Sequence, residues 1–148
     1  MIASPPPKRR PPALKRTNGA HMRATSLLSS FGYAFAGLWH LLSTQRNAKI
    51  HVVLGLAAAA LGLLLGIDRY EWLALIVTIT IVLAAEGINT AIEAVVDMVA
   101  PEYHPLAKIA KDVGAGTVLL TAIASVVVGL VLFLPHLWPI VLRWFVER

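Results

Sequence analysis

Apolar residues recur at helical intervals between residues 25 and 44, and polar residues fill the positions between them. The apolar set includes Leu27, Phe31, Phe35, Leu38 and Leu42. This spacing predicts an amphipathic helix with one apolar face. Because a long apolar block follows it, we expect the helix over 25–44 to lie flat in a membrane interface.

Three further blocks are predominantly apolar and long enough to cross a membrane, namely 48–67, 71–98 and 109–134. A helix rises about 1.5 Å per residue, so about 20 apolar residues cross a hydrocarbon layer of about 30 Å. Aromatic and aliphatic residues continue after Pro135, and we expect 135–148 to be an interfacial tail. The pattern predicts an all-α integral membrane domain over 25–134, with an N-terminal amphipathic surface helix and three transmembrane helices.

The composition agrees with a membrane protein. Hydrophobic residues make up 57% of the 148 residues, charged residues make up 14%, and the mean hydropathy is +0.72. Soluble domains have about 25% charged residues. Because the chain has no cysteine, disulfides, thiolate metal sites and cysteine nucleophiles are excluded.

The segment 1–24 is basic and rich in proline, and it contains no acidic residue. We expect a disordered tail that can touch anionic headgroups, and we do not expect nucleic-acid binding. Part of it, Gly19 to Met22, resembles a vector-derived junction. Lys and Arg are concentrated before the first span and around the second loop, which predicts a cytoplasmic N-terminus, a cytoplasmic second loop and an external C-terminus.

Four polar residues occupy one face of the second predicted span: Glu86, Asn89, Glu93 and Asp97. At 100° per residue their spacing of i, i+3, i+7 and i+11 confines them to a stripe about 80° wide. A charged residue in a membrane helix costs about 2.5 to 3.5 kcal/mol on insertion scales, so two buried glutamates indicate a task or a partner. The alternatives to catalysis are a structural helix bundle, in which these acids pair with lysines, and a proton or cation pathway.

A second polar cluster, Lys108, Lys111 and Asp112, opens the third predicted helix. Lysine can act as a point charge on phosphate, and carboxylates with Mg²⁺ can bridge phosphoryl oxygens, so the two clusters together favour phosphoryl transfer. The chain has no Walker-type or kinase-type glycine-rich motif. Gly114 and Gly116 are better explained by close helix packing than by a phosphate cradle.

Residues 85–97 followed by 101–112 resemble the prokaryotic diacylglycerol kinase and undecaprenol kinase family. The resemblance combines a Glu-x-x-Asn-(Ser/Thr)-Ala-Ile-Glu-x-x-Val-Asp segment with a downstream Lys-Asp at fixed distance. The layout is similar from about Ser26 to Leu134. The resemblance implies a homotrimeric, multi-pass enzyme of the bacterial plasma membrane that transfers the ATP γ-phosphate to a membrane lipid alcohol.

The resemblance also implies roles for individual residues. Glu86 would be the general base for the lipid hydroxyl, Asn89 would help to position the reacting groups, and Glu93 would hold Mg²⁺ about 10 Å nearer the nucleotide. The remaining residues would line the nucleotide site, namely Tyr33, Glu102, Tyr103, His104, Lys111 and Asp112.

The chain departs from the family pattern at Gln45, where many relatives carry a glutamate that is the second metal ligand. The amide oxygen of Gln45 can coordinate a hard cation but brings no charge, so we expect Mg²⁺ to be held more weakly there. The loop over 105–112 looks more like undecaprenol kinases of Gram-positive type than like proteobacterial diacylglycerol kinases. The expected acceptor is therefore undecaprenol, with diacylglycerol as the alternative.

Overall fold

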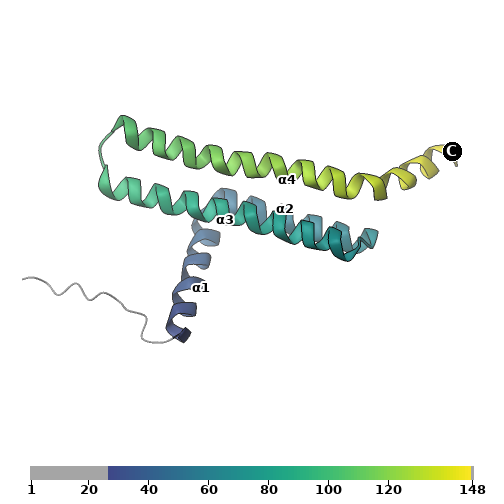
Figure 1. Cartoon of the computed structure of the whole chain (residues 1–148), viewed down its shortest axis with the longest axis horizontal. Coiled ribbons are helices and arrows are strands. Elements are labelled where there is room, and N and C mark those ends of the chain that lie inside the picture. Colours follow the sequence, from purple (N-terminus) through teal and green to yellow (C-terminus); the bar gives the residue numbers. More distant parts are fainter. Residues whose placement is uncertain (1–26, 148) are drawn as a thin grey trace, which may run out of the picture.

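The computed structural model describes residues 27–147, and the basic segment 1–24 lies outside them. The regular structure of the described residues is entirely helical: α1 (Leu27–Thr44), α2 (Arg46–Leu65), α3 (Arg69–Val99) and α4 (Pro105–Val146). Helices α2, α3 and α4 run side by side, and α1 projects across their direction (Figure 1). Three of the helices are long and apolar enough to cross a membrane, so the predicted surface helix with three spans is confirmed.

Two local features, a left-handed glycine and a capping box, form the turn between α2 and α3. Gly66 ends α2 in the left-handed conformation (φ 66°), which glycine adopts without the steric cost of a Cβ. Asp68 then forms a capping box with Glu71: its side chain accepts the N–H of Glu71 at 2.9 Å, and Glu71 Oε2 accepts the N–H of Asp68 at 2.7 Å. These bonds satisfy orphan donors at the start of α3.

An apolar cluster packs the three long helices together at this end of the molecule. Its buried members are Ile67, Leu75, Leu132 and Phe133, each with less than a tenth of its surface exposed. Most other large apolar side chains of the long helices face outward; Leu64, for example, is 84% exposed. Outward apolar surface is expected where lipid is the solvent.

Helix α4 begins earlier and ends later than the span predicted over 109–134. It starts at Pro105, because proline suits the first turn and His104 Nδ1 accepts the N–H of Leu106 at 3.2 Å. It continues through Pro135 and Pro139, where the ribbon bends away from α3 (Figure 1). Proline removes one helical hydrogen bond and kinks the helix, but here it does not end it.

Candidate functional site

Two polar residues of α3 are buried in the middle of the bundle. Glu86 is 2% exposed and Asn89 is 7% exposed. One side-chain oxygen of each, Glu86 Oε2 and Asn89 Oδ1, is buried without a hydrogen-bond partner among the described residues. An unsatisfied buried polar atom costs about 1 to 3 kcal/mol, so its presence requires an explanation such as a functional role.

The Asn89 side chain is held between α3 and α4. Its Nδ2 donates to Glu93 Oε1 at 3.0 Å, and this orients the amide because only the nitrogen can donate to a carboxylate. The other end of the amide, Oδ1, lies against Gly114 of α4, where a Cβ would be 2.3 Å from Oδ1. Gly114 therefore provides the space that Asn89 occupies.

The two glycines of the predicted packing segment have different surroundings. A Cβ on Gly116 would meet nothing within 4 Å, whereas a Cβ on Gly114 would collide with Asn89. The interpretation of Gly114 as a packing glycine therefore agrees with the structure, and the same interpretation of Gly116 has no contact to support it. Sequence alone does not distinguish them, since the difference depends on how α3 and α4 align.

The connection between α3 and α4 gathers the second polar cluster. Lys111 pairs with Asp97 across the two helices, and Lys108 pairs with Asp112 one turn along α4. These residues line an open hollow of about 430 Å³ with the predicted nucleotide residues of the loop, Glu102, Tyr103 and His104. The hollow is open, and both lysines and carboxylates line it.

The ion pairs of the described residues argue against the structural alternative, in which the acids of the stripe pair with lysines. Among the four residues of the polar stripe, Asp97 alone forms an ion pair between two helices. The two lysines of the second cluster pair with Asp112 and Asp97, and neither pairs with Glu86 or Glu93. Glu93 instead accepts the amide of Asn89, and Glu86 retains a free oxygen.

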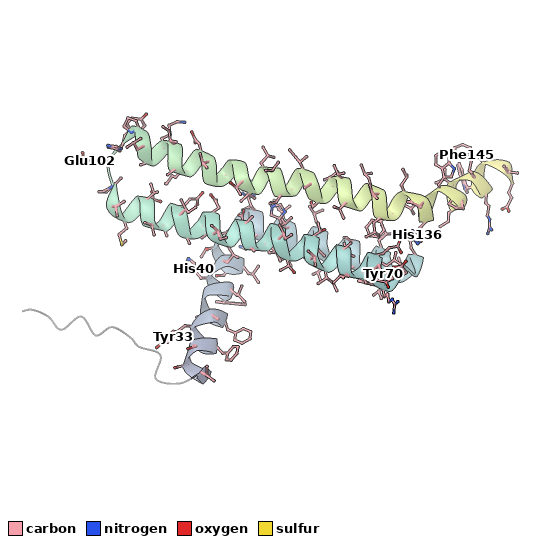
Figure 2. The ribbon with its side chains drawn as sticks, in the orientation of Figure 1. Tyr33, His40, Tyr70, Glu102, His136 and Phe145 are labelled. Atoms are coloured by element: carbon pink, nitrogen blue, oxygen red, sulfur yellow. The ribbon has the colours of Figure 1, made fainter. Side chains whose placement is uncertain are left out.

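The predicted nucleotide residue Tyr33 and the predicted metal ligand Gln45 lie on α1 and at its junction with α2. Tyr33 is on α1 and is 52% exposed, and Figure 2 shows it well away from Glu102 at the α3–α4 connection. Gln45 is the N-cap residue of α2, at the junction with α1, and its side chain makes no capping hydrogen bond. A single chain does not bring Tyr33 to the hollow at the hairpin.

Among residues 27–147 no group of three or more His, Asp or Glu side chains forms a ready-made metal cage. The oxygen donors still fit Mg²⁺, which is usually bound through one or two carboxylates together with substrate phosphates. Glu93 could supply such a carboxylate, and Glu86, whose Oε2 has no hydrogen-bond partner among the described residues, lies two turns away on the same face.

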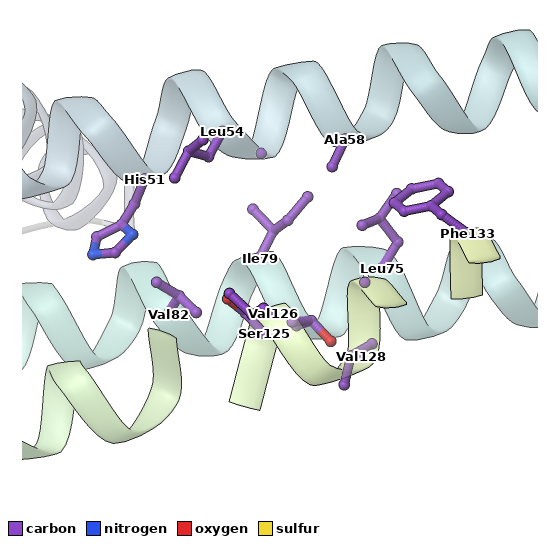
Figure 3. A pocket seen from close by; sticks show the side chains of 13 residues that line it. His51, Leu54, Ala58, Leu75, Ile79, Val82, Ser125, Val126, Val128 and Phe133 are labelled. Atoms are coloured by element: carbon purple, nitrogen blue, oxygen red, sulfur yellow. The ribbon is translucent and has the colours of Figure 1, made fainter. Parts of the chain in front are cut away.

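His51 is a further ionisable residue that the sequence reasoning did not single out. It lies on α2 within electrostatic range of Glu86. It also lines a cavity of about 210 Å³ between α2, α3 and α4, whose other labelled walls are mostly apolar (Figure 3). The available signal was a lone titratable side chain inside an otherwise apolar span.

Comparison with known proteins gives a consistent result. The family model described as prokaryotic diacylglycerol kinase matches residues 32–133. A diacylglycerol kinase from Synechocystis is 48% identical over 115 residues, which cover 77% of this chain and 66% of that protein. The undecaprenol kinase of Bacillus subtilis is 39% identical over 73% of this chain and 88% of its own length. The diacylglycerol kinase of Escherichia coli is 32% identical over 76% and 92%, respectively.

The matched region contains α2 and α3 entirely, and with them Glu86, Asn89, Glu93 and the polar hairpin. The relatives named above are all lipid kinases by name, which confirms the resemblance found in the sequence. The chain therefore belongs to the prokaryotic diacylglycerol kinase family of membrane lipid kinases.

Proposed function

We propose that this chain transfers the γ-phosphate of ATP to the hydroxyl of a membrane lipid alcohol, with undecaprenol as the first acceptor to test. The observation that carries the proposal is the free, buried oxygen of Glu86, placed on the same helical face as a carboxylate held by Asn89. A general base must have a lone pair that no other group occupies, within reach of the proton it removes. Among the described residues, Glu86 Oε2 has no hydrogen-bond partner that it would have to give up.

In this mechanism the lipid hydroxyl donates its proton to Glu86 Oε2. The alcohol oxygen forms a bond to the γ-phosphorus, the bond from that phosphorus to the β–γ bridging oxygen breaks, and ADP leaves with the electron pair. Proton removal by a positioned carboxylate contributes a factor of about 10² to 10⁴ in rate. Exclusion of water from the Glu86 side of the site limits hydrolysis of ATP.

Asn89 acts as the positioning residue between the two carboxylates. Its amide donates to Oε1 of Glu93, so Glu93 Oε2 would be the oxygen that holds a metal ion. Glu93 and Gln45 are the proposed Mg²⁺ ligands, and Gln45 would contribute a neutral amide oxygen. When bound, Mg²⁺ neutralises charge that develops on the phosphoryl oxygens.

The hollow at the hairpin is the proposed site for the ATP phosphates. Lys111 and Asp112 would exchange their present contacts for phosphate and metal contacts, and the loop residues Glu102, Tyr103 and His104 would line the nucleotide. The positive-inside rule assigns this hairpin to the cytoplasm, where ATP is available. Tyr33 would join the site only if α1 approached the hairpin or another copy supplied it.

A homotrimer is part of the proposal. An open groove of about 550 Å³ between α3 and α4 is lined by small and aliphatic residues, and Asn89 and Gly114 lie among them. Small residues allow close approach of another membrane helix. A neighbouring subunit seated there would cover this groove.

The named relatives support both candidate acceptors, undecaprenol and diacylglycerol. The 39% identical relative is named undecaprenol kinase, and the 48% identical relative is named diacylglycerol kinase. We retain undecaprenol as the first candidate on the sequence of the 105–112 loop. Diacylglycerol is the second.

Purified full-length chain in detergent with Mg-ATP and either lipid tests the proposal. We expect radiolabelled phosphate from γ-labelled ATP in the lipid fraction, with higher kcat/KM for undecaprenol. Higher kcat/KM for diacylglycerol would replace the first acceptor by the second. Phosphorylation of neither lipid, by protein shown to be folded by its thermal transition, would remove the kinase proposal.

A further inference from the structure

The C-terminal part of α4 is amphipathic in its own right. His136, Arg143 and Glu147 follow one another at i, i+7 and i+11, which confines them to a stripe about 40° wide. The remaining surface is apolar and exposed: Trp138 is 59% exposed and Phe145 is 68% exposed. This segment begins after the region matched by the family model, which ends at residue 133.

The length of α2 gives the position of this segment along the membrane normal. Its 20 residues span about 30 Å, the thickness of the hydrocarbon layer, so α1 marks one boundary and the α2–α3 turn marks the other. Phe133 of α4 is buried beside Ile67 of that turn. Residues 135–147 therefore start at the second boundary, and about 20 Å of helix lies beyond it.

An apolar helix that continued straight would stand in water. Full burial of one large apolar side chain is worth about 1.5 to 3 kcal/mol, so such exposure is strongly disfavoured. Pro135 and Pro139 interrupt the hydrogen-bond ladder at this level, and the ribbon bends away from α3 there (Figure 1).

The start of the segment is tied to the α2–α3 turn on its polar side. His136 Nε2 lies 3.5 Å from Glu71 Oε2, and Figure 2 places His136 beside the Tyr70 end of α3. Leu137, the next residue, packs against the apolar cluster. These contacts hold the start of the polar stripe at the turn, whereas Val141 and Phe145 on the opposite face are 46% and 68% exposed in the described part of the chain.

We propose that residues 135–147 form a second surface helix, which lies in the headgroup–acyl boundary of the leaflet opposite to α1. Its apolar face enters the acyl region, and its polar stripe faces water. Tryptophan is typical of that depth, and Arg143 can pair with lipid phosphate. The chain then has one surface helix at each boundary, and the pair restrains the tilt and depth of the three spans.

The absence of native cysteine makes a direct test simple. Single variants V141C and F145C place a spin label on the apolar face, and R143C and E147C place it on the polar stripe. The labelled full chain is reconstituted in phosphatidylcholine vesicles with phosphatidylglycerol. Collision with oxygen, which concentrates in acyl chains, is compared with collision with a water-soluble nickel complex. L130C, on the exposed surface of the span, is the membrane reference.

We expect V141C and F145C to collide with oxygen nearly as often as L130C does and to be shielded from nickel, with at least tenfold lower nickel-to-oxygen ratios than R143C and E147C. Equal nickel access at all four positions would overturn the proposal, because the tail would then stand in water. Exclusion of both reagents at V141C and F145C, with spin–spin broadening, would also overturn it in favour of a second copy of the chain. The readout is independent of kinase activity.

Discussion

The α2–α3 turn and the Glu86 region of α3 follow opposite rules. At the α2–α3 turn, backbone donors are capped, and Leu75, Leu132 and Phe133 belong to a buried apolar cluster. Around Glu86 and Asn89, two buried oxygens have no hydrogen-bond partner among the described residues. The turn satisfies its polar groups and buries its apolar ones, whereas the Glu86 region breaks the rule that buried polar groups are satisfied. Stability and chemistry are therefore assigned to different parts of the same helices.

The substitution Glu86→Gln tests this contrast most directly. The amide keeps the shape of the side chain but cannot take a proton, so we expect turnover to fall by a factor of about 10² to 10⁴. The thermal transition in detergent should not fall, because the change removes a buried ionisable group rather than a satisfied contact. Full activity of Glu86→Gln would show that Glu86 is not the base, and a large loss of thermal stability would show that its burial is structural.

Gly114→Ala addresses the positioning of Asn89 without touching a catalytic group. The new methyl would lie 2.3 Å from Asn89 Oδ1, so the amide must move and its bond to Glu93 is strained. A displacement near 1 Å in an active site can cost about 10²-fold, and we expect a loss of about 10- to 100-fold in kcat.

Gly116→Ala is the matched control for Gly114→Ala, because it adds the same methyl to the same helix in open space. It should retain activity. An equal loss in both variants would mean that helix flexibility, and not the Asn89 contact, controls the site. A rise in the Mg²⁺ requirement specific to Gly114→Ala would support transmission through Glu93.

The helices were predictable because apolar periodicity and length decide them. The end of α4 was not, because proline near a membrane boundary can bend a helix as well as end it. The polar stripe on α3 follows from the 100° step of a helix, and the structure has Glu86 and Asn89 buried on it. The contact of Asn89 with Gly114 depends on the alignment of two helices, which local sequence does not specify.

A variant at the α2–α3 turn is expected to have the reverse effect. Asp68→Ala removes the side chain that accepts the N–H groups of Tyr70 and Glu71, so the free energy of unfolding should fall by about 1 kcal/mol. Turnover per folded molecule should be unchanged below the thermal transition. The folded fraction and the turnover are measured at the same temperature. Asp68→Asn, which can still cap, should restore most of the stability. Loss of turnover in fully folded Asp68→Ala would show that the α2–α3 turn also controls the Glu86 region and would refute the separation of stability and chemistry.

The smallest effect is expected at Gln45, the position where the sequence departs from the family pattern. Gln45 is partly exposed at the junction of α1 and α2, so a carboxylate there contributes less than about 1 kcal/mol to cation binding. Gln45→Glu should therefore lower the Mg²⁺ concentration needed for half-maximal activity by about threefold. Asn47→Glu, which adds the same charge two residues along, controls for a general attraction of cations to this surface. Equal shifts in both variants, or no shift in Gln45→Glu, would remove Gln45 from the metal site and leave Glu93 as the proposed protein ligand that the contacts of α3 support.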